Sequence, residues 1–292
     1  MAEIPYSSFL ASKPFRFIVG PHREEFTLHS ALVASQSRAL NVVVNGPMKE
    51  ATDGFTTWED VDGQTFTRFG QYVYTGDYEG ESPLEPEPMP EEPRLEELVA
   101  VADEEQEAGE EPKAEEEPQY TVDFWDSAMT SKKKSKKKRA ENTDLMPSLT
   151  KREILLYEFE NNRLYDCGIA GIHFSPRNRN CLLEYKEVFL SHARLHMVAE
   201  YYGVEKLAQL TLHKLHRTLC NFVLHNERIG DVVGLLRYCF EEDERVELRE
   251  LVVMYSVCHF EKLWESADFQ QLLKAHTELS VAILGSMLAR LD

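Results

Sequence analysis

Two histidines, His192 and His196, lie four residues apart in SHARLH, so a helix would place both imidazoles on one face. Such a pair could hold a metal ion only with further ligands, because structural zinc takes four. No third ligand is close in the sequence, and the neighbouring residues are those of a core helix, so we expect two packing histidines. Cys167, His173 and Cys181 are irregularly spaced and predict no metal site either.

The sequence contains none of the short motifs that mark common catalytic or nucleotide-binding sites. The P-loop, nucleophile-elbow, zincin and dinucleotide-binding patterns are all missing from it. We therefore expect no enzymatic activity, no cofactor, no metal and no small-molecule substrate.

The compartment follows from the cysteines and the apolar pattern. Five cysteines without a C-x-x-C pair indicate reduced thiols. The start of the chain, MAEIPYSSFLASKPF, lacks the features of a signal peptide, and no apolar run is long enough for a membrane span. We expect an intracellular protein of the nucleus and/or cytoplasm, with no membrane partner.

Charge is distributed unevenly along the 292 residues, whose formal net charge is −19. The tract from Glu81 to Glu117 holds 16 acidic and two basic residues, a net −14, so the remainder is nearly balanced. Because this acidity repels phosphate, we expect no nucleic-acid partner.

A basic run, SKKKSKKKR, follows the acidic tract. Its charged members are Lys132, Lys133, Lys134, Lys136, Lys137, Lys138 and Arg139. Three roles remain open: a nuclear localisation signal that a transport receptor binds in extended form, a solvated run attracted to the acidic tract, and a phosphate contact. The aromatic segment YTVDFW, Tyr120 to Trp125, is either a short linear motif or a segment that docks on the folded body.

Residues 15–78 contain closely spaced short elements. FRFIV and EFTLH are β-prone runs on either side of the turn sequence GPHR, which predicts a hairpin. Ser30 and Ser37 are each expected to cap a short helix by accepting a hydrogen bond from a first-turn N–H. FTTW returns to strand alternation, and Asp62 is expected to cap a longer helix that Gly76 ends.

Residues 80–145 are rich in Pro and Glu and poor in large apolar side chains. Burial there cannot offset the entropy of ordering the chain, so we expect disorder. Order resumes at a capping box formed by Thr150 and Glu153. Two strong helices are then expected, from Glu187 to Tyr202 and from Val204 to Phe222.

The last third of the chain adds three or four amphipathic helices to an apolar stripe on the helix that precedes it. The stripe consists of Ala208, Leu212, Leu215, Leu219 and Phe222. The apolar residues of the tail that indicate helices are Leu248, Leu251, Val252 and Tyr255, then Ile283, Leu284, Met287, Leu288 and Leu291. The tail is either a separate binding module or an extension that packs on the stripe. We favour packing, because a small domain gains stability from a larger core.

Three stretches resemble the BTB/POZ domain family in their residues and in their order. They are PFRFIVGPHREEFTLHSALVASQS, then VVVNGPMKEATDGFTTWEDVDGQTFTRFGQYVYTGDYEG, then FLSHARLHMVAEYYGVEKLAQLTLHKL. In that family a hairpin ends in a histidine that opens the first helix pair, as His29 would. An aromatic-rich helix then ends in a Tyr-Thr-Gly turn, here Tyr74-Thr75-Gly76.

The resemblance implies an α+β fold with a short mixed sheet flanked by helices, a long disordered insertion and an all-α C-terminal extension. The first part of the domain would span 13–79, the insertion 80–147, a helix, a loop and the closing helices 148–222, and the extension 223–292. A charged insertion and a helical tail are similar to those of BTB proteins in filamentous fungi. The extra N-terminal strand of many dimeric members is not expected in MAEIPYSSFLASK.

The resemblance also implies a non-catalytic protein–protein interaction module that acts as an adaptor or scaffold. In BTB adaptors of cullin-RING ubiquitin ligases, a hydrophobic-x-Glu motif after the second helix contacts the cullin, and Met48-Lys49-Glu50 occupies that position. An exposed Met offers a flexible apolar contact, and the Glu beside it can accept a charge-assisted hydrogen bond.

The alternative is a homo- or heterodimerising regulatory protein, nuclear and linked to transcription, without a ligase role. A two-fold dimer uses the same self-complementary surface of both subunits. In the family this surface comes from the first helices, and the candidates here are Ala31, Leu32, Ala34, Leu40 and Val43, which are equally suited to the core.

Overall fold

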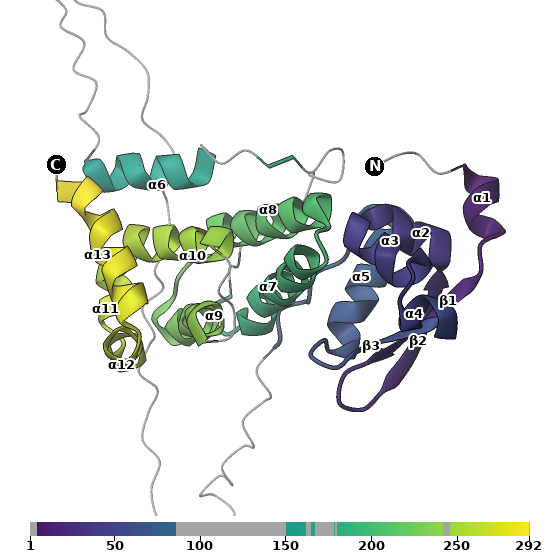
Figure 1. Ribbon diagram of the computed structural model, residues 1–292. Helices are drawn as coiled ribbons and strands as arrows, with labels where there is room; N and C mark the ends of the chain where they lie inside the picture. Colours follow the sequence, from purple (N-terminus) through teal and green to yellow (C-terminus); the bar gives the residue numbers. More distant parts are fainter. Residues whose placement is uncertain are drawn as a thin grey trace, which may run out of the picture. The chain divides into compact units, whose positions relative to one another are not determined.

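The computed structural model describes residues 5–85, 150–161, 165, 166, 178, 180–241 and 246–291 (Figure 1). Its strands are β1 (Pro14–Val19), β2 (Glu24–His29) and β3 (Phe55–Trp58). The helices of the first part are α1 (Tyr6–Leu10), α2 (Ser30–Gln36), α3 (Arg38–Asn45), α4 (Lys49–Asp53) and α5 (Gly63–Thr75). Those of the second part are α6 (Lys151–Asn161), α7 (Lys186–Tyr201), α8 (Glu205–Asn221), η3 (Asn226–Arg228), α9 (Ile229–Glu241), α10 (Val246–Cys258), α11 (Phe260–Trp264), α12 (Ala267–Ala275) and α13 (Thr277–Leu291).

The sheet is small and mixed, with the strand order β2-β1-β3. The predicted hairpin is confirmed as the antiparallel pair β1–β2, and β3 runs parallel to β1. The rings of Phe17, Trp58 and Phe66 contact one another with centroids 4.9–5.4 Å apart, which packs α5 against the sheet. The α+β class and the mixed sheet are therefore confirmed, within a chain whose described part is mostly helical.

Two predicted helix starts are confirmed by their side-chain caps. Ser37 Oγ accepts a hydrogen bond from the backbone N–H of Leu40 at 3.1 Å, which begins α3. Asp62 accepts one from the N–H of Thr65 at 2.8 Å, which begins α5. The predicted stop is confirmed as well, because Gly76 has a φ of 76° and so takes the left-handed conformation that favours glycine.

The predicted cap at Ser30 is wrong, because Ser30 is already the first residue of α2. His29 is the N-cap residue, and its side chain makes no capping hydrogen bond. Its ring Nδ1 is instead hydrogen-bonded to the hydroxyl of Tyr74 at 2.8 Å, and it meets the ring of Phe9 edge-on. Helix α2 thus begins directly after His29. The element before the hairpin is helix α1 and not a strand.

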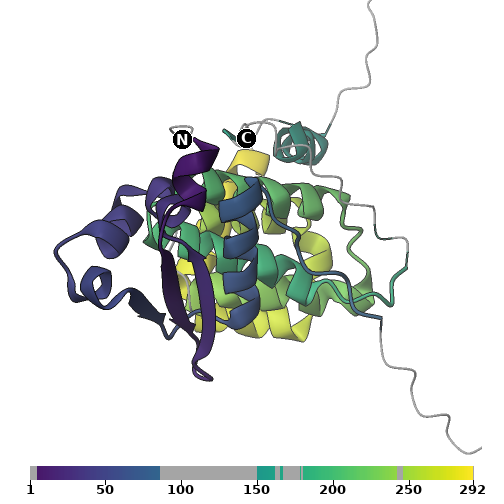
Figure 2. The same ribbon diagram turned by 90° about the vertical axis from the view of Figure 1, so that its right-hand side faces the viewer.

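Helices α7 and α8 take part in two hydrophobic cores. One core joins them to the sheet and to α2, α3 and α5, and the other joins them to α6 and α9–α13 (Figures 1 and 2). The first core uses Leu195, Val198, Ala199, Leu207, Ala208 and Leu210 of these two helices, and the second uses Val188, Phe189, Leu190, Ala193, Leu212, Leu215 and Leu219.

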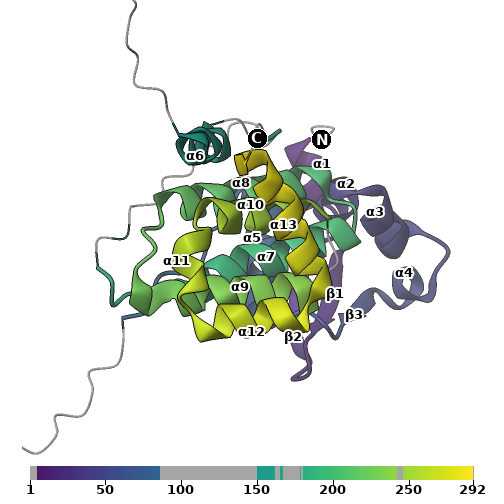
Figure 3. The same ribbon diagram turned by 90° about the vertical axis from the view of Figure 1, so that its left-hand side faces the viewer.

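The tail packs on most of the predicted apolar stripe, as we favoured: Leu212, Leu215, Leu219 and Phe222 belong to its core, whereas Ala208 packs in the first core. The described tail has five α-helices, α9–α13, rather than three or four (Figure 3). Its last predicted stripe is only partly right. On α13, Ile283 is buried, whereas Leu284 and Leu288 are exposed.

Described structure continues through Glu85, beyond the predicted boundary after residue 79. Arg68 donates to the carbonyl of Glu79 at 3.2 Å and forms an ion pair with Glu81, whose N–H donates to Ser191 Oγ at 3.2 Å. An isolated antiparallel bridge then joins Leu84 to Glu184. Composition did not reveal these partners, because they lie on α5, on α7 and just before α7.

A buried polar cluster fixes the beginning of the same segment. Lys214 of α8 pairs with Asp77 at 2.5 Å, donates to the carbonyl of Tyr78 and lies over the Tyr78 ring. The Tyr78 hydroxyl is hydrogen-bonded to His192 Nδ1 at 2.8 Å. We call residues 77–84 the anchored segment.

The capping box at α6 is confirmed, since Thr150 and Glu153 exchange backbone-to-side-chain hydrogen bonds of 2.8 and 3.3 Å. The predicted disorder after Glu85, the YTVDFW segment and the basic run Lys132–Arg139 lie outside the described residues, as do Cys167 and His173.

Candidate functional site

The Met48-Lys49-Glu50 motif lies where α3 turns into α4. Met48 is the N-cap residue of α4, Glu50 lies in the first turn, and Gly54, with a φ of 73°, ends the helix. Met48 is 48% exposed, and Glu50 is partly exposed. Neither side chain takes part in a hydrogen bond or ion pair among the described residues, so both are free to contact a partner.

The turn is tight, and the chain passes very close to itself at Gly46. The Gly46 N–H donates to the carbonyl of Val42 at 2.8 Å, and a Cβ at this position would lie 2.3 Å from that same oxygen. Only glycine fits without moving the backbone. A hollow of about 340 Å³ lies beside the turn, between the start of β1 and α4, and its lining includes Lys13, Ala51 and Thr52.

The residues predicted for the dimer interface lie partly at the surface and partly in the core. Leu40 is 0% exposed and packs in the first core, which corrects its place among the surface candidates. Ala31, Leu32 and Val43 are half-buried. Val42, which is not among the predicted candidates, is 39% exposed, so α3 presents this large apolar side chain to solvent.

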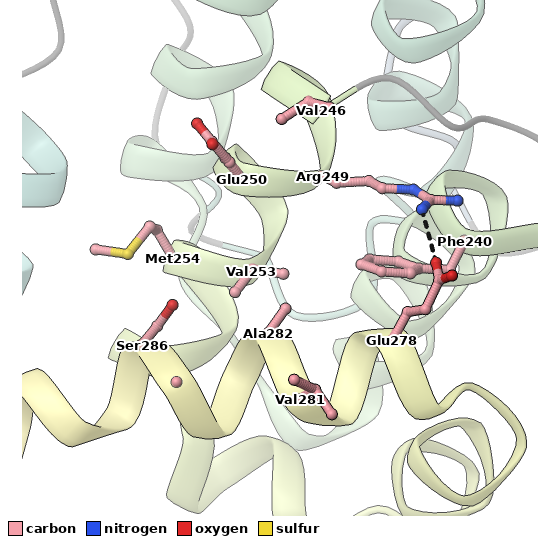
Figure 4. Close-up of a pocket in the computed structure, with 11 residues that line it drawn as sticks. Phe240, Val246, Arg249, Glu250, Val253, Met254, Glu278, Val281, Ala282 and Ser286 are labelled. Carbon is pink, nitrogen blue, oxygen red and sulfur yellow. Dashed lines mark hydrogen bonds and ion pairs between the residues drawn. The ribbon is translucent and has the colours of Figure 1, made fainter.

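A larger groove of about 580 Å³ lies between α10 and α13 (Figure 4). Two of its polar groups satisfy each other: Arg249 pairs with Glu278 at 3.0 Å and lies over the ring of Phe240. Its walls are apolar, with Val253 and Val281 among them. Its lining holds no group of His, Cys, Asp or Glu side chains arranged for a metal ion, and its chemistry does not identify an occupant.

The two histidines of SHARLH face separate partners on a buried helix. His192 is hydrogen-bonded to Tyr78, and His196 Nδ1 to Thr211 Oγ1 at 3.1 Å. Burial raises the pKa of Tyr78 well above its ordinary value, with the negative charge of Asp77 adding to the effect. Tyr78 and His192 are both buried, and the hydrogen bond between them holds the anchored segment to α7.

Within the described residues, no group of three or more His, Cys, Asp or Glu side chains is arranged to hold a metal ion. In the same residues, no helix combines the length and apolar character that crossing a membrane requires.

Sequence reasoning missed an aromatic and acidic groove that begins where β3 ends. It combines the Trp58-Glu59-Asp60 sequence with the adjacent Tyr201 and Tyr202 at the end of α7. The only signals in the sequence were these two short clusters, which lie far apart along the chain.

Comparison of the chain with models of protein families, with curated proteins and with solved structures found no match in any of the three.

Proposed function

We propose that the protein is a non-catalytic interaction module that acts as an adaptor or scaffold and recruits substrates to a cullin-RING ubiquitin ligase. The proposal combines the resemblance to BTB adaptors with one structural observation. Met48, half exposed at the N-cap of a short helix, stands close to Glu50 in the first turn of that helix. A contact surface that is already folded before binding presents both side chains at a low entropic cost.

The physical demands on such a contact are met by the two side chains. The thioether chain of Met48 adapts to a shallow apolar pocket, and the Glu50 carboxylate can accept a charge-assisted hydrogen bond. Since the two side chains have no partners among the described residues, binding would not have to break existing hydrogen bonds or ion pairs.

The test is retention of a cullin by the immobilised protein, with and without the motif. We expect wild type to retain the cullin and Met48→Ala/Glu50→Ala to lose most of it, by about tenfold or more in affinity if the two contacts contribute together. The control Tyr157→Ala/Glu158→Ala removes an exposed aromatic and an exposed carboxylate from α6 and should retain the cullin fully. No retention by wild type, or equal retention by both double variants, would contradict the proposal.

The alternative function, a dimerising regulatory protein of the nucleus, is favoured by the exposure of Val42 beside the half-buried Leu32 and Val43. On this hypothesis light scattering during size-exclusion chromatography gives a dimer mass at concentrations on the order of tens of micromolar. Val42→Asp would place like charges near the two-fold axis and weaken the dimer by about tenfold or more. Leu182→Asp, at an exposed leucine before α7, is the control, and a monomer at all concentrations would exclude this alternative.

A further inference from the structure

Two hollows that share part of their lining lie where β3 leads into α5 and passes α7. Their volumes are about 210 and 370 Å³. Both are lined by Glu59, Asp60, Val61, Met197 and Val198. We call this surface the acidic aromatic groove.

The first hollow has an aromatic wall. Trp58, only 3% exposed, stacks on Tyr202 with centroids 4.1 Å apart. Tyr201 is 71% exposed and meets Tyr202 edge-on at 4.8 Å. Aromatic faces attract cations through the negative charge above and below the ring, so this wall suits a positively charged group.

The carboxylates of the groove outnumber its cations. Glu59 and Asp60 are exposed and form no ion pair among the described residues. Arg194, in the second hollow, is already paired with Glu187 at 3.0 Å. Burial raises the pKa of Tyr202, and the charge of Asp60 is one of the further causes, which places that carboxylate near the aromatic wall. A cationic ligand would therefore meet the ring faces and unpaired negative charge together.

Trp58 of the aromatic wall also carries an unpartnered donor. The indole N–H of Trp58 is buried and has no hydrogen-bond acceptor among the described residues. A buried donor without an acceptor costs free energy, so this atom indicates that the isolated chain lacks an acceptor here. Because this N–H is covered, it is not itself a contact for a ligand, and the choice of a Lys or Arg side chain rests on the ring faces and the unpaired carboxylates.

We propose that the acidic aromatic groove binds a peptide segment of another protein through a Lys or Arg side chain, whose cationic head packs on Tyr201 and Tyr202 and pairs with Asp60 and Glu59. This surface lies at the end of β3, whereas Met48 and Glu50 lie before its beginning, so the two sites are separated by the length of a strand. The inference does not depend on cullin binding. Because the two sites are separate, two different proteins can bind at the same time, one at each site.

The experiment measures fluorescence anisotropy of labelled peptides with the full chain. The probes are a peptide of alternating Lys and Gly, the same peptide with trimethyl-lysine, and a peptide of alternating Glu and Gly. We expect both cationic probes to bind and the Glu probe to fail. Glu59→Gln/Asp60→Asn should weaken binding of the Lys probe by about tenfold, and Tyr201→Ala by about fivefold, as expected for losing an ion pair and a cation–π contact.

A matched control separates the groove from the general acidity of the chain. Glu250→Gln/Glu265→Gln neutralises two exposed carboxylates, one on α10 and one just after α11, and should change binding by less than about twofold. Tyr201→Ala changes no charge, so a loss in this variant cannot come from the acidic tract. Equal binding by wild type, Tyr201→Ala and the Glu59/Asp60 variant would overturn the proposal.

One further variant tests the chain's own basic run as the occupant. Replacing the charged residues from Lys132 to Arg139 by Ser should leave binding of the Lys probe unchanged. If the probe then binds about tenfold more tightly, the run competes for the groove, and the assignment to another protein is wrong. Cullin retention by the groove variants should equal that of wild type, which keeps this test distinct from that of Met48 and Glu50.

Discussion

A chain that ends at Phe222 is expected to lose its cooperative fold, although the predicted BTB-like part is complete at that residue. Helices α9–α13 would be missing, and the faces of α7 and α8 that they cover would be exposed to water. These faces include Phe189, Leu215 and Leu219, all buried in the full chain. Burying one such side chain contributes about 1.5–3 kcal/mol, and the whole stability of a domain is about 5–15 kcal/mol. The free energy lost by exposing several of these side chains would therefore exceed the stability of the domain.

The measurement is thermal unfolding followed by near-ultraviolet circular dichroism, with binding of a hydrophobic dye as a second readout. The shortened chain should show no sharp transition and should bind the dye. Leu284→Ala/Leu288→Ala, which removes two exposed leucines from α13, is the control and should unfold nearly as wild type does. A soluble shortened chain with a sharp transition would show that the first core is stable without the second.

Lowering the pH from 7 to 4 is expected to destabilise the protein through His259, by roughly 3 kcal/mol. His259 lies at the N-cap of α11, with its ring 4.5 Å from that of Tyr255. Burial lowers its pKa to about 4, helped by the positive charges of Arg152 and Lys262 and opposed by Glu261. Because the unfolded chain binds the proton near pH 6.5 and the folded chain only near pH 4, stability is present above pH 6.5 and is lost as the pH falls.

Urea unfolding at several pH values would test this dependence. His259→Phe keeps a ring against Tyr255 but cannot take up a proton, so its stability should fall by roughly 3 kcal/mol less than that of wild type between pH 7 and pH 4. Protonation of carboxylates acts on both proteins and cancels in the comparison. The control is His22→Gln, at an exposed position in the hairpin turn. Parallel stability curves for wild type and His259→Phe would exclude a buried neutral imidazole at this position.

Local chemistry predicted much of the fold, because the signals lay within a few residues of what they determined. Ser37, Asp62 and Gly76 begin or end helices as expected, since a side-chain oxygen or a left-handed glycine acts on the adjacent turn. The predicted cap at Ser30 was wrong because the neighbouring His29 is the N-cap residue. The described structure runs past the predicted boundary near residue 80 because Arg68 and Ser191 hold that segment. Both residues are distant in the sequence, and the composition of the segment itself does not reveal them.

The candidate sites show the same limit. The sequence placed Met48 and Glu50 in a turn, but it could not tell an exposed Met48 from a buried one, nor separate the buried Leu40 from the exposed Val42. The acidic aromatic groove could not be foreseen, because Trp58 and Tyr202 meet only once the sheet and α7 have packed together.

The anchored segment also determines how mechanical load would enter the fold. A pull applied along the chain from beyond Glu85 acts first on the two backbone hydrogen bonds between Leu84 and Glu184, then on the contacts of Glu81, and only then on the pair of the buried Lys214 and the half-exposed Asp77. These attachments lie in series along one extended stretch, so they would yield one after another. Tension in the insertion would thus release the segment stepwise before it reached α5.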